Sequence, residues 1–124
     1  MRNLEQIRAS HALEFYANNG STALHGEEQG DVIRGLPALV IGNGLLATLA
    51  FAKMKGKGFA TYANAIASYL ASPAPQGPAV VSATARDVDG LLRYLSAADS
   101  LVLQHATAET LAYLAYLKRF APRS

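Results

Sequence analysis

The sequence predicts an all-α protein, a single compact bundle of about five helices around a central apolar helix, with residues 1–124 forming one helical domain. Two observations predict this class. Apolar residues recur every three or four positions in several segments, which is the period of an amphipathic helix, and no segment alternates convincingly as a strand does. A chain of 124 residues is also long enough for one domain and too short for two.

Four amphipathic helices are predicted besides the central one. The first spans about residues 3–18 and ends at Asn19-Gly20, because glycine commonly terminates helices. The other three span about residues 62–71, 86–97 and 99–121, and the last of them stops before Pro122. Prolines and a glycine crowd residues 72–78, so we expect the connection over about residues 72–84 to be the most mobile segment.

The central helix is expected over Pro37–Lys55, in a helical stretch that begins near residue 30 and is kinked by the proline. Residues 35–52 are uncharged, which indicates a helix surrounded by others. We interpret Asn43 as bonded to a neighbouring helix or loop, and Gly42 and Gly44 as sites of close helix approach. A membrane span is the alternative for an uncharged run of 18 residues, but its proline, glycines and polar residues suit lipid poorly.

The last helix is the most informative stretch, because it is amphipathic and ends in a basic-aromatic cluster. One broad arc of its helical wheel is apolar and should pack, and consists of Val102, Leu103, Ala106, Leu111, Tyr113, Leu114, Leu117 and Phe120. The opposite side holds His105, Glu109, Tyr116 and Arg119, within about 80° of one another. Since a core does not need that second group, we expect it to carry function.

Composition favours a cytoplasmic protein. The sequence has no cysteine, so it has neither disulfides nor thiolate metal sites. No apolar run follows the first residues, which predicts no signal peptide and no membrane partner.

Positive charge collects at two predicted helix ends, although the net charge is only +2. Residues 32–58 contain no acidic residue and place Lys53, Lys55 and Lys57 around a glycine-containing turn. Residues 118–124 are also free of acidic residues and include Lys118 and Arg119. Lysine and arginine neutralise phosphates without reading base sequence, so both ends are candidates for nucleic-acid backbone contacts. The alternative is a solvated face whose charges complement the helix dipoles.

We find no constellation typical of catalysis, so we expect no enzymatic activity, no metal and no cofactor. His105 and Glu109 lie four residues apart on one helix face, but a zinc site needs three or four ligands, and a small hydrolase built on this pair is the third alternative. His11 is expected to be a core histidine bonded to a carbonyl, and His25 lies in a loop without a supporting pattern. Asp87 is expected to support the N-terminus of the fourth predicted helix.

Two separated runs carry a family pattern. The first matches L-P-x-x-I-x-x-N-G-L-x-x-T-L-A-F followed by Lys, through Leu36, Pro37, Asn43, Gly44, Leu45, Thr48, Leu49, Ala50, Phe51 and Lys55. The second matches E-x-L-x-x-L-x-W-L-K-R-F-A, through Glu109, Leu111, Leu114, Leu117, Lys118, Arg119, Phe120 and Ala121. Val40-Ile41 shifts the aliphatic spacing slightly, and Tyr116 stands where tryptophan is usual. With its Leu-Glu-Gln-x-Arg-Ala start, the chain resembles the small all-helical subunit of the Cmr-type (type III-B) CRISPR RNA-targeting complex.

The resemblance implies a non-catalytic subunit whose copies stack into a short filament along the guide–target RNA duplex, while other subunits perform the chemistry. The implied partners are the other Cmr complex subunits, further copies of this chain, the guide RNA and the target RNA. The residues expected to contact the RNA backbone are Arg8, Lys53, Lys55, Lys57, Lys118 and Arg119. The alternative is a free-standing helical protein-interaction or regulatory protein with no nucleic-acid role.

Overall fold

The computed structural model describes residues 3–19, 31–72 and 79–121 of the chain. Over these ranges the protein contains six helices and no strand, so the predicted all-α class is confirmed. The helices are α1 (Leu4–Asn19), α2 (Asp31–Asn43), α3 (Leu45–Lys55), α4 (Lys57–Leu70), α5 (Val88–Ala97) and α6 (Ser100–Phe120). Among the described residues, no helix is long and apolar enough to cross a membrane.

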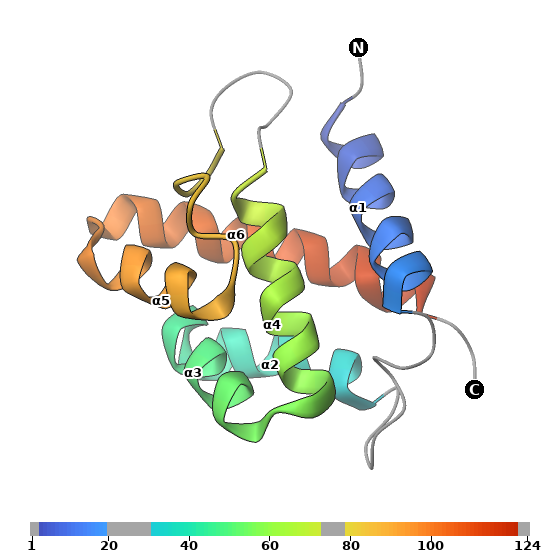
Figure 1. Cartoon of the computed structure of the whole chain (residues 1–124), viewed down its shortest axis with the longest axis horizontal. Helices are drawn as coiled ribbons and strands as arrows, with labels where there is room; N and C mark the ends of the chain where they lie inside the picture. Colours follow the sequence, from blue (N-terminus) through green and yellow to red (C-terminus); the bar gives the residue numbers. More distant parts are fainter. Residues whose placement is uncertain (1–2, 20–30, 73–78, 122–124) are drawn as a thin grey trace.

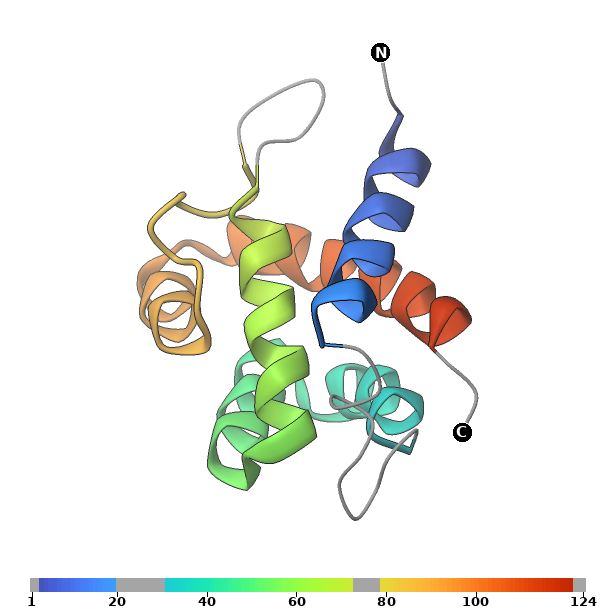
Figure 2. The ribbon, with the colours of Figure 1, turned by 45° about the vertical axis from the view of Figure 1, so that its right-hand side comes forward.

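The longest helix, α6, organises the fold. It has 21 residues and therefore extends about 32 Å, at roughly 1.5 Å per residue. Helices α1 and α4 stand side by side across it, while α2 and α3 form a lower layer and α5 lies at the opposite side from α1 (Figures 1 and 2). Helix α6 packs against α1, α2 and α4, and α4 also packs against α2, α3 and α5. The core therefore forms where α4 and α6 meet the other helices, and residues 37–55 contribute to it as two helices, α2 and α3, and not as the single central helix that the sequence predicted.

The predicted central helix is divided in two at Gly44. This residue has φ 90° and ψ 159°, a conformation that is essentially restricted to glycine. Its N–H still donates to the carbonyl of Val40 at 2.9 Å, and its carbonyl accepts from the N–H of Thr48 at 3.1 Å, so one residue closes α2 and opens α3. Pro37, by contrast, lies inside α2 without ending it.

The interpretations of the residues around this break were wrong. Asn43 is exposed, so its side-chain amide is not buried against a neighbouring helix or loop as predicted. A side chain added at Gly42 or Gly44 would meet nothing within 4 Å, so neither glycine permits close helix approach. Ile41 and Met54 are 75% and 80% exposed, so the two halves have open faces and are not surrounded.

The turn after α3 is much tighter than the sequence suggested. Gly56 has φ 75° and Lys57 has φ 52°, and α4 begins at once, five residues before the predicted start at Tyr62. The N–H of Gly56 donates to the carbonyl of Ala52 at 3.0 Å, which closes α3 in the manner of a glycine C-cap. The predicted glycine break is thus confirmed, but the expected loop before the next helix is absent between residues 56 and 62.

The second half of the predicted mobile connection packs on the core. Residues 73–78 lie outside the described ranges. Val81, however, is buried and its N–H donates to the carbonyl of Leu70 at 3.2 Å. Asp87 then caps α5, accepting a hydrogen bond from the N–H of Gly90 at 2.7 Å, as its predicted supporting role requires.

The buried face of α6 is narrower than the predicted arc. Ala106, Tyr113, Leu114 and Leu117 are buried as expected, and Thr110 joins them by donating its hydroxyl to the carbonyl of Ala106 at 2.7 Å. Val102, Leu103 and Leu111 are only partly buried at the margins of this face, and Phe120 is exposed.

Candidate nucleic-acid interface

The first group of predicted site residues surrounds the α3–α4 junction, and we call it the α3–α4 cationic turn: Lys53, Lys55 and Lys57. All three side chains are exposed. Lys53 and Lys55 occupy the last turn of α3, where a positive charge complements the helix dipole, and Lys57 is the first residue of α4. Lys53 also forms an ion pair with Asp89 of α5. Because both of its partners are about half exposed, this pair contributes little stability.

The second group, which we call the α6 cationic end, comprises Lys118 and Arg119. Both lie exposed in the last turn of α6. Phe120 follows them and meets Tyr116 edge-on, with ring centroids 6.2 Å apart. The α6 end lies at one side of the molecule and the α3–α4 turn at its lower edge, in both Figure 1 and Figure 2. The fold therefore presents two separate cationic sites and does not combine them into one patch.

Arg8, the sixth predicted site residue, has a different environment. Its Nη2 donates to Oε2 of Glu109 at 2.7 Å, and the two side chains are only 18% and 15% exposed. Burial lowers the pKa of Arg8, but hydrogen bonds to Tyr69 and Glu109 outweigh this effect and raise the pKa above its usual value. Arg8 therefore joins α1 to α6 and has its charge balanced inside the protein.

Glu109 belongs to the same network and not to a polar outer face shared with His105. Its Oε1 accepts from the hydroxyl of Tyr69 at 3.0 Å, whereas His105 is exposed. Among the described residues, no three potential ligands of the His, Cys, Asp or Glu type lie close enough to hold a metal ion. His25 lies outside the described ranges.

A cluster of buried tyrosines, which sequence reasoning missed, connects α1, α4 and α6. The hydroxyl of Tyr16 donates to the carbonyl of Leu117 at 2.7 Å and lies 3.0 Å from that of Tyr62. Tyr69 stacks on Tyr113 with ring centroids 4.3 Å apart. His11 is half-buried and meets the Tyr69 ring edge-on, where the sequence predicted a core histidine bonded to a carbonyl. Burial raises the pKa of Tyr69 to about 12 and also raises those of Tyr16, Tyr62 and Tyr113.

The signal for this cluster was present in the spacing of the chain. Tyr62 and Tyr69 are seven residues apart, which places them on one face of α4. Tyrosine has an apolar ring and a polar hydroxyl, so it occurs both in cores and on surfaces. The helical periodicity of the sequence therefore did not predict that these hydroxyls would be buried and bonded to other helices.

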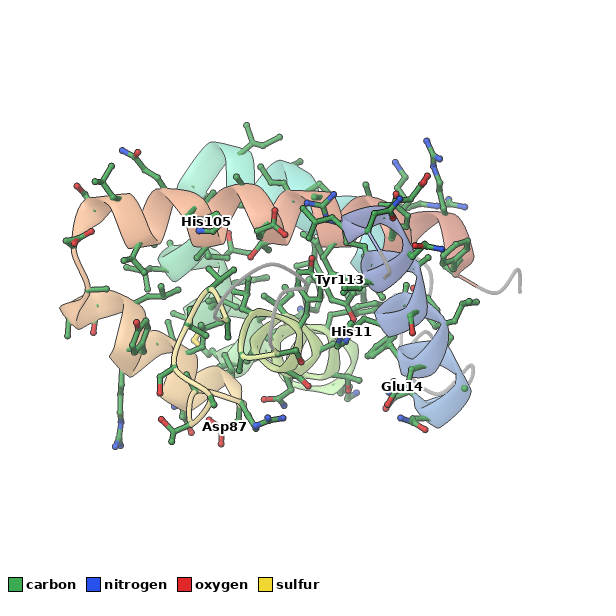
Figure 3. All side chains as sticks on the ribbon, turned by 90° about the horizontal axis from the view of Figure 1, so that it is seen from above. His11, Glu14, Asp87, His105 and Tyr113 are labelled. Atoms are coloured by element: carbon green, nitrogen blue, oxygen red, sulfur yellow. The ribbon has the colours of Figure 1, made fainter. Side chains whose placement is uncertain are left out.

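Between α1 and α4 the surface holds an open groove of about 490 Å³. Its lining is mostly polar and includes His11, Glu14, Asn18, Asn64 and Arg86. Figure 3 shows His11 and Glu14 on the side of α1 that faces α4, with Tyr113 deeper between them and α6. None of the six predicted site residues lines this groove.

The fold and the sequence together place the chain among the CRISPR-associated proteins. Residues 4–123 match a family model described as CRISPR-associated protein (Cas_Cmr5). The structure also matches the crystal structure of a CRISPR-associated Cmr5 family protein from Thermus thermophilus, with a TM-score of 0.72 and 30% sequence identity. That match covers 98% of this chain and 96% of the other. The chain belongs to the Cmr5 family, as the resemblance of its two motifs predicted. No curated protein sequence matches it significantly.

Proposed function

We propose that the chain is a non-catalytic small subunit of a type III-B CRISPR complex that is guided by RNA and targets RNA in the cytoplasm. The observation that carries this proposal is the family match over residues 4–123. In the complex, copies of the chain stack head to tail, since a filament requires two different surfaces on each subunit. The RNA is held through its backbone, because base pairing with the guide supplies sequence recognition.

Exposed apolar side chains support a role in assembly. Ile41, Met54 and Leu101 are each more than 70% exposed, and Leu13 on α1 is also exposed. These residues belong to four different helices, α1, α2, α3 and α6. Apolar surface of this kind is suited to contacts with copies of the chain and with other subunits of the complex.

The exposed basic residues support contact with phosphates. We assign the RNA contacts to the α3–α4 cationic turn and the α6 cationic end, because their ammonium and guanidinium groups are open to solvent. Arg8 enters the proposal as the residue that fixes α1 on α6, since Glu109 already balances its charge. Two separate cationic sites on one small subunit suit an extended polyanion that passes along a filament.

The test is retention of target RNA by the assembled complex over a range of salt concentrations. Replacing Lys53, Lys55 and Lys57 together by alanine should weaken retention without lowering the melting temperature by more than about 5 °C, since an exposed ion pair contributes at most about 1 kcal/mol. Each phosphate that a subunit no longer neutralises should flatten the slope of log affinity against log salt by about 0.7–0.9. Arg93→Ala is the matched control, because Arg93 is an exposed cation on α5 outside both sites.

The α6 cationic end is tested in the same assay. Arg119→Ala should weaken RNA retention or assembly more than Lys118→Ala does. Lys118 borders the apolar arc beside Leu111 and Leu114, which its stem covers, whereas Arg119 lies about 100° further around the helix on the polar side. Lost affinity with an unchanged salt slope would assign Arg119 to a protein contact. Normal assembly and retention by all of these variants would instead favour a protein without a nucleic-acid role.

A further inference from the structure

The groove between α1 and α4 is a feature that neither the family membership nor the cationic ends explain. Both helices pack on α6, and the open groove lies between them, with Tyr113 of α6 among its lining residues. Its volume of about 490 Å³ lies within the range of sites that bind small ligands or peptide segments. The floor is formed in part by the rings of Phe15 and Tyr113.

The walls of this α1–α4 groove offer hydrogen-bond donors and acceptors. Oδ1 of Asn64 accepts from the N–H of Val88 at 2.9 Å, which leaves the N–H groups of the amide as donors. The Thr61 hydroxyl donates to the carbonyl of Lys57 at 3.1 Å, which leaves its lone pairs as acceptors. Ser68 on α4 and Asn18 on α1 add further groups of both kinds. An extended peptide presents one donor and one acceptor per residue, and the walls carry groups of both kinds that can bond to them.

Two opposite charges line the same groove from different elements. Glu14 projects from α1, and Arg86 comes from the connection that joins α4 to α5. Arg86 is oriented by its Nε, which donates to the carbonyl of Ala83 at 3.0 Å. A carboxylate in the wall disfavours a phosphate backbone, and Tyr113 is too deeply buried, at 2% exposure, to stack on a base. The chemistry therefore favours a protein segment over RNA.

We propose that the α1–α4 groove binds an extended segment of a partner protein, with a basic side chain against Glu14 and an acidic side chain against Arg86. The proposal rests on the proposed function only in that the partner is one of the other subunits of the complex. It does not depend on RNA binding, because no residue of the groove belongs to the α3–α4 cationic turn or to the α6 cationic end.

The first test places a photo-reactive amino acid at Ser68 in the assembled complex. Ser96, an exposed serine on α5 outside the groove, is the matched control position. We expect Ser68 to cross-link to one continuous protein segment that contains a basic residue. Cross-links to RNA, or no more cross-linking than at Ser96, would overturn the proposal. Retention of target RNA in the same samples reports separately on the proposed function.

The second test exchanges the charge in the groove. The cross-linked segment, synthesised as a peptide, should bind Glu14→Lys about tenfold more weakly than the unmodified protein, and a peptide whose basic residue is changed to glutamate should recover the loss. Glu5→Lys is the control, because Glu5 is exposed on the same helix and lies outside the groove. Equal weakening by the two variants, or no recovery with the charge-reversed peptide, would overturn the proposal.

Discussion

The ion pair between Arg8 and Glu109 yields the sharpest prediction about stability. Helix α1 packs mainly on α6, and this pair joins the two helices. Glu109→Gln keeps the size of the side chain and an oxygen for the Tyr69 hydroxyl, but it removes the charge that balances Arg8. The variant should therefore destabilise the fold by leaving the Arg8 guanidinium without its counter-ion in a mostly buried position.

The magnitude follows from distance and burial. At 2.7 Å, and with an effective dielectric constant of about 20, the direct attraction of the pair is about 6 kcal/mol. Loss of one partner of a fully buried pair costs about 3–5 kcal/mol, because the remaining ion stays buried without its counter-charge and only the desolvation cost of the removed ion is recovered. Since water reaches 15–18% of these two side chains, we expect about 2–3 kcal/mol for Glu109→Gln.

Chemical denaturation followed by circular dichroism measures this change directly. Glu5→Gln is the control, because Glu5 is exposed on α1, and it should shift stability by less than about 1 kcal/mol. In a double-mutant cycle with Arg8→Gln, the two single changes should be non-additive by at least about 1 kcal/mol. Additive effects, or a loss for Glu109→Gln no larger than the control, would refute the role assigned to this pair.

Three further predictions concern the core, the helix break and alkaline pH. Leu114→Ala should lower the free energy of unfolding by about 2–5 kcal/mol, because Leu114 is fully buried. Leu111→Ala should lower it by clearly less, because Leu111 is only partly buried at the margin of the buried face of α6. Equal midpoints of urea unfolding for the two variants would contradict this. Gly42→Ala should stabilise the fold by at most about 0.5–1 kcal/mol, because Gly42 lies in the last turn of α2 and an added methyl group meets nothing within 4 Å. Gly44→Ala should instead destabilise the fold by about 1–3 kcal/mol, because Gly44 has a positive φ, and calorimetric melting would reveal any reversal of this order. Because burial raises the pKa of Tyr69 to about 12 from an ordinary value of 10.0, stability should be unaffected by tyrosine below about pH 10 and fall between pH 10 and pH 12. Tyrosinate absorbance that precedes the loss of helix in that range would show the ring to be accessible in the folded state.

The candidate site was predictable in composition and not in geometry. Lys53, Lys55, Lys57, Lys118 and Arg119 are exposed at helix ends, as their sequence context indicated. A helical wheel placed Glu109 with His105, because it shows only the helix to which both residues belong. Glu109 accepts hydrogen bonds from Arg8 and Tyr69, which lie 101 and 40 residues away in sequence. Such long-range partners leave no periodic trace in a single chain.

By itself, the sequence determined the helical class, the cap at Asp87, the glycine break at residue 56 and the family, because each depends on local chemistry or on a contiguous motif. Only the tertiary structure decided which helix is central. The uncharged run of residues 35–52 predicts a surrounded helix, but Gly44 divides it into two helices with open faces, and α4 is the helix that packs against the largest number of others. An apolar sequence shows that a helix surface can be buried at little cost. Which of several apolar surfaces is buried depends on how all the helices pack together.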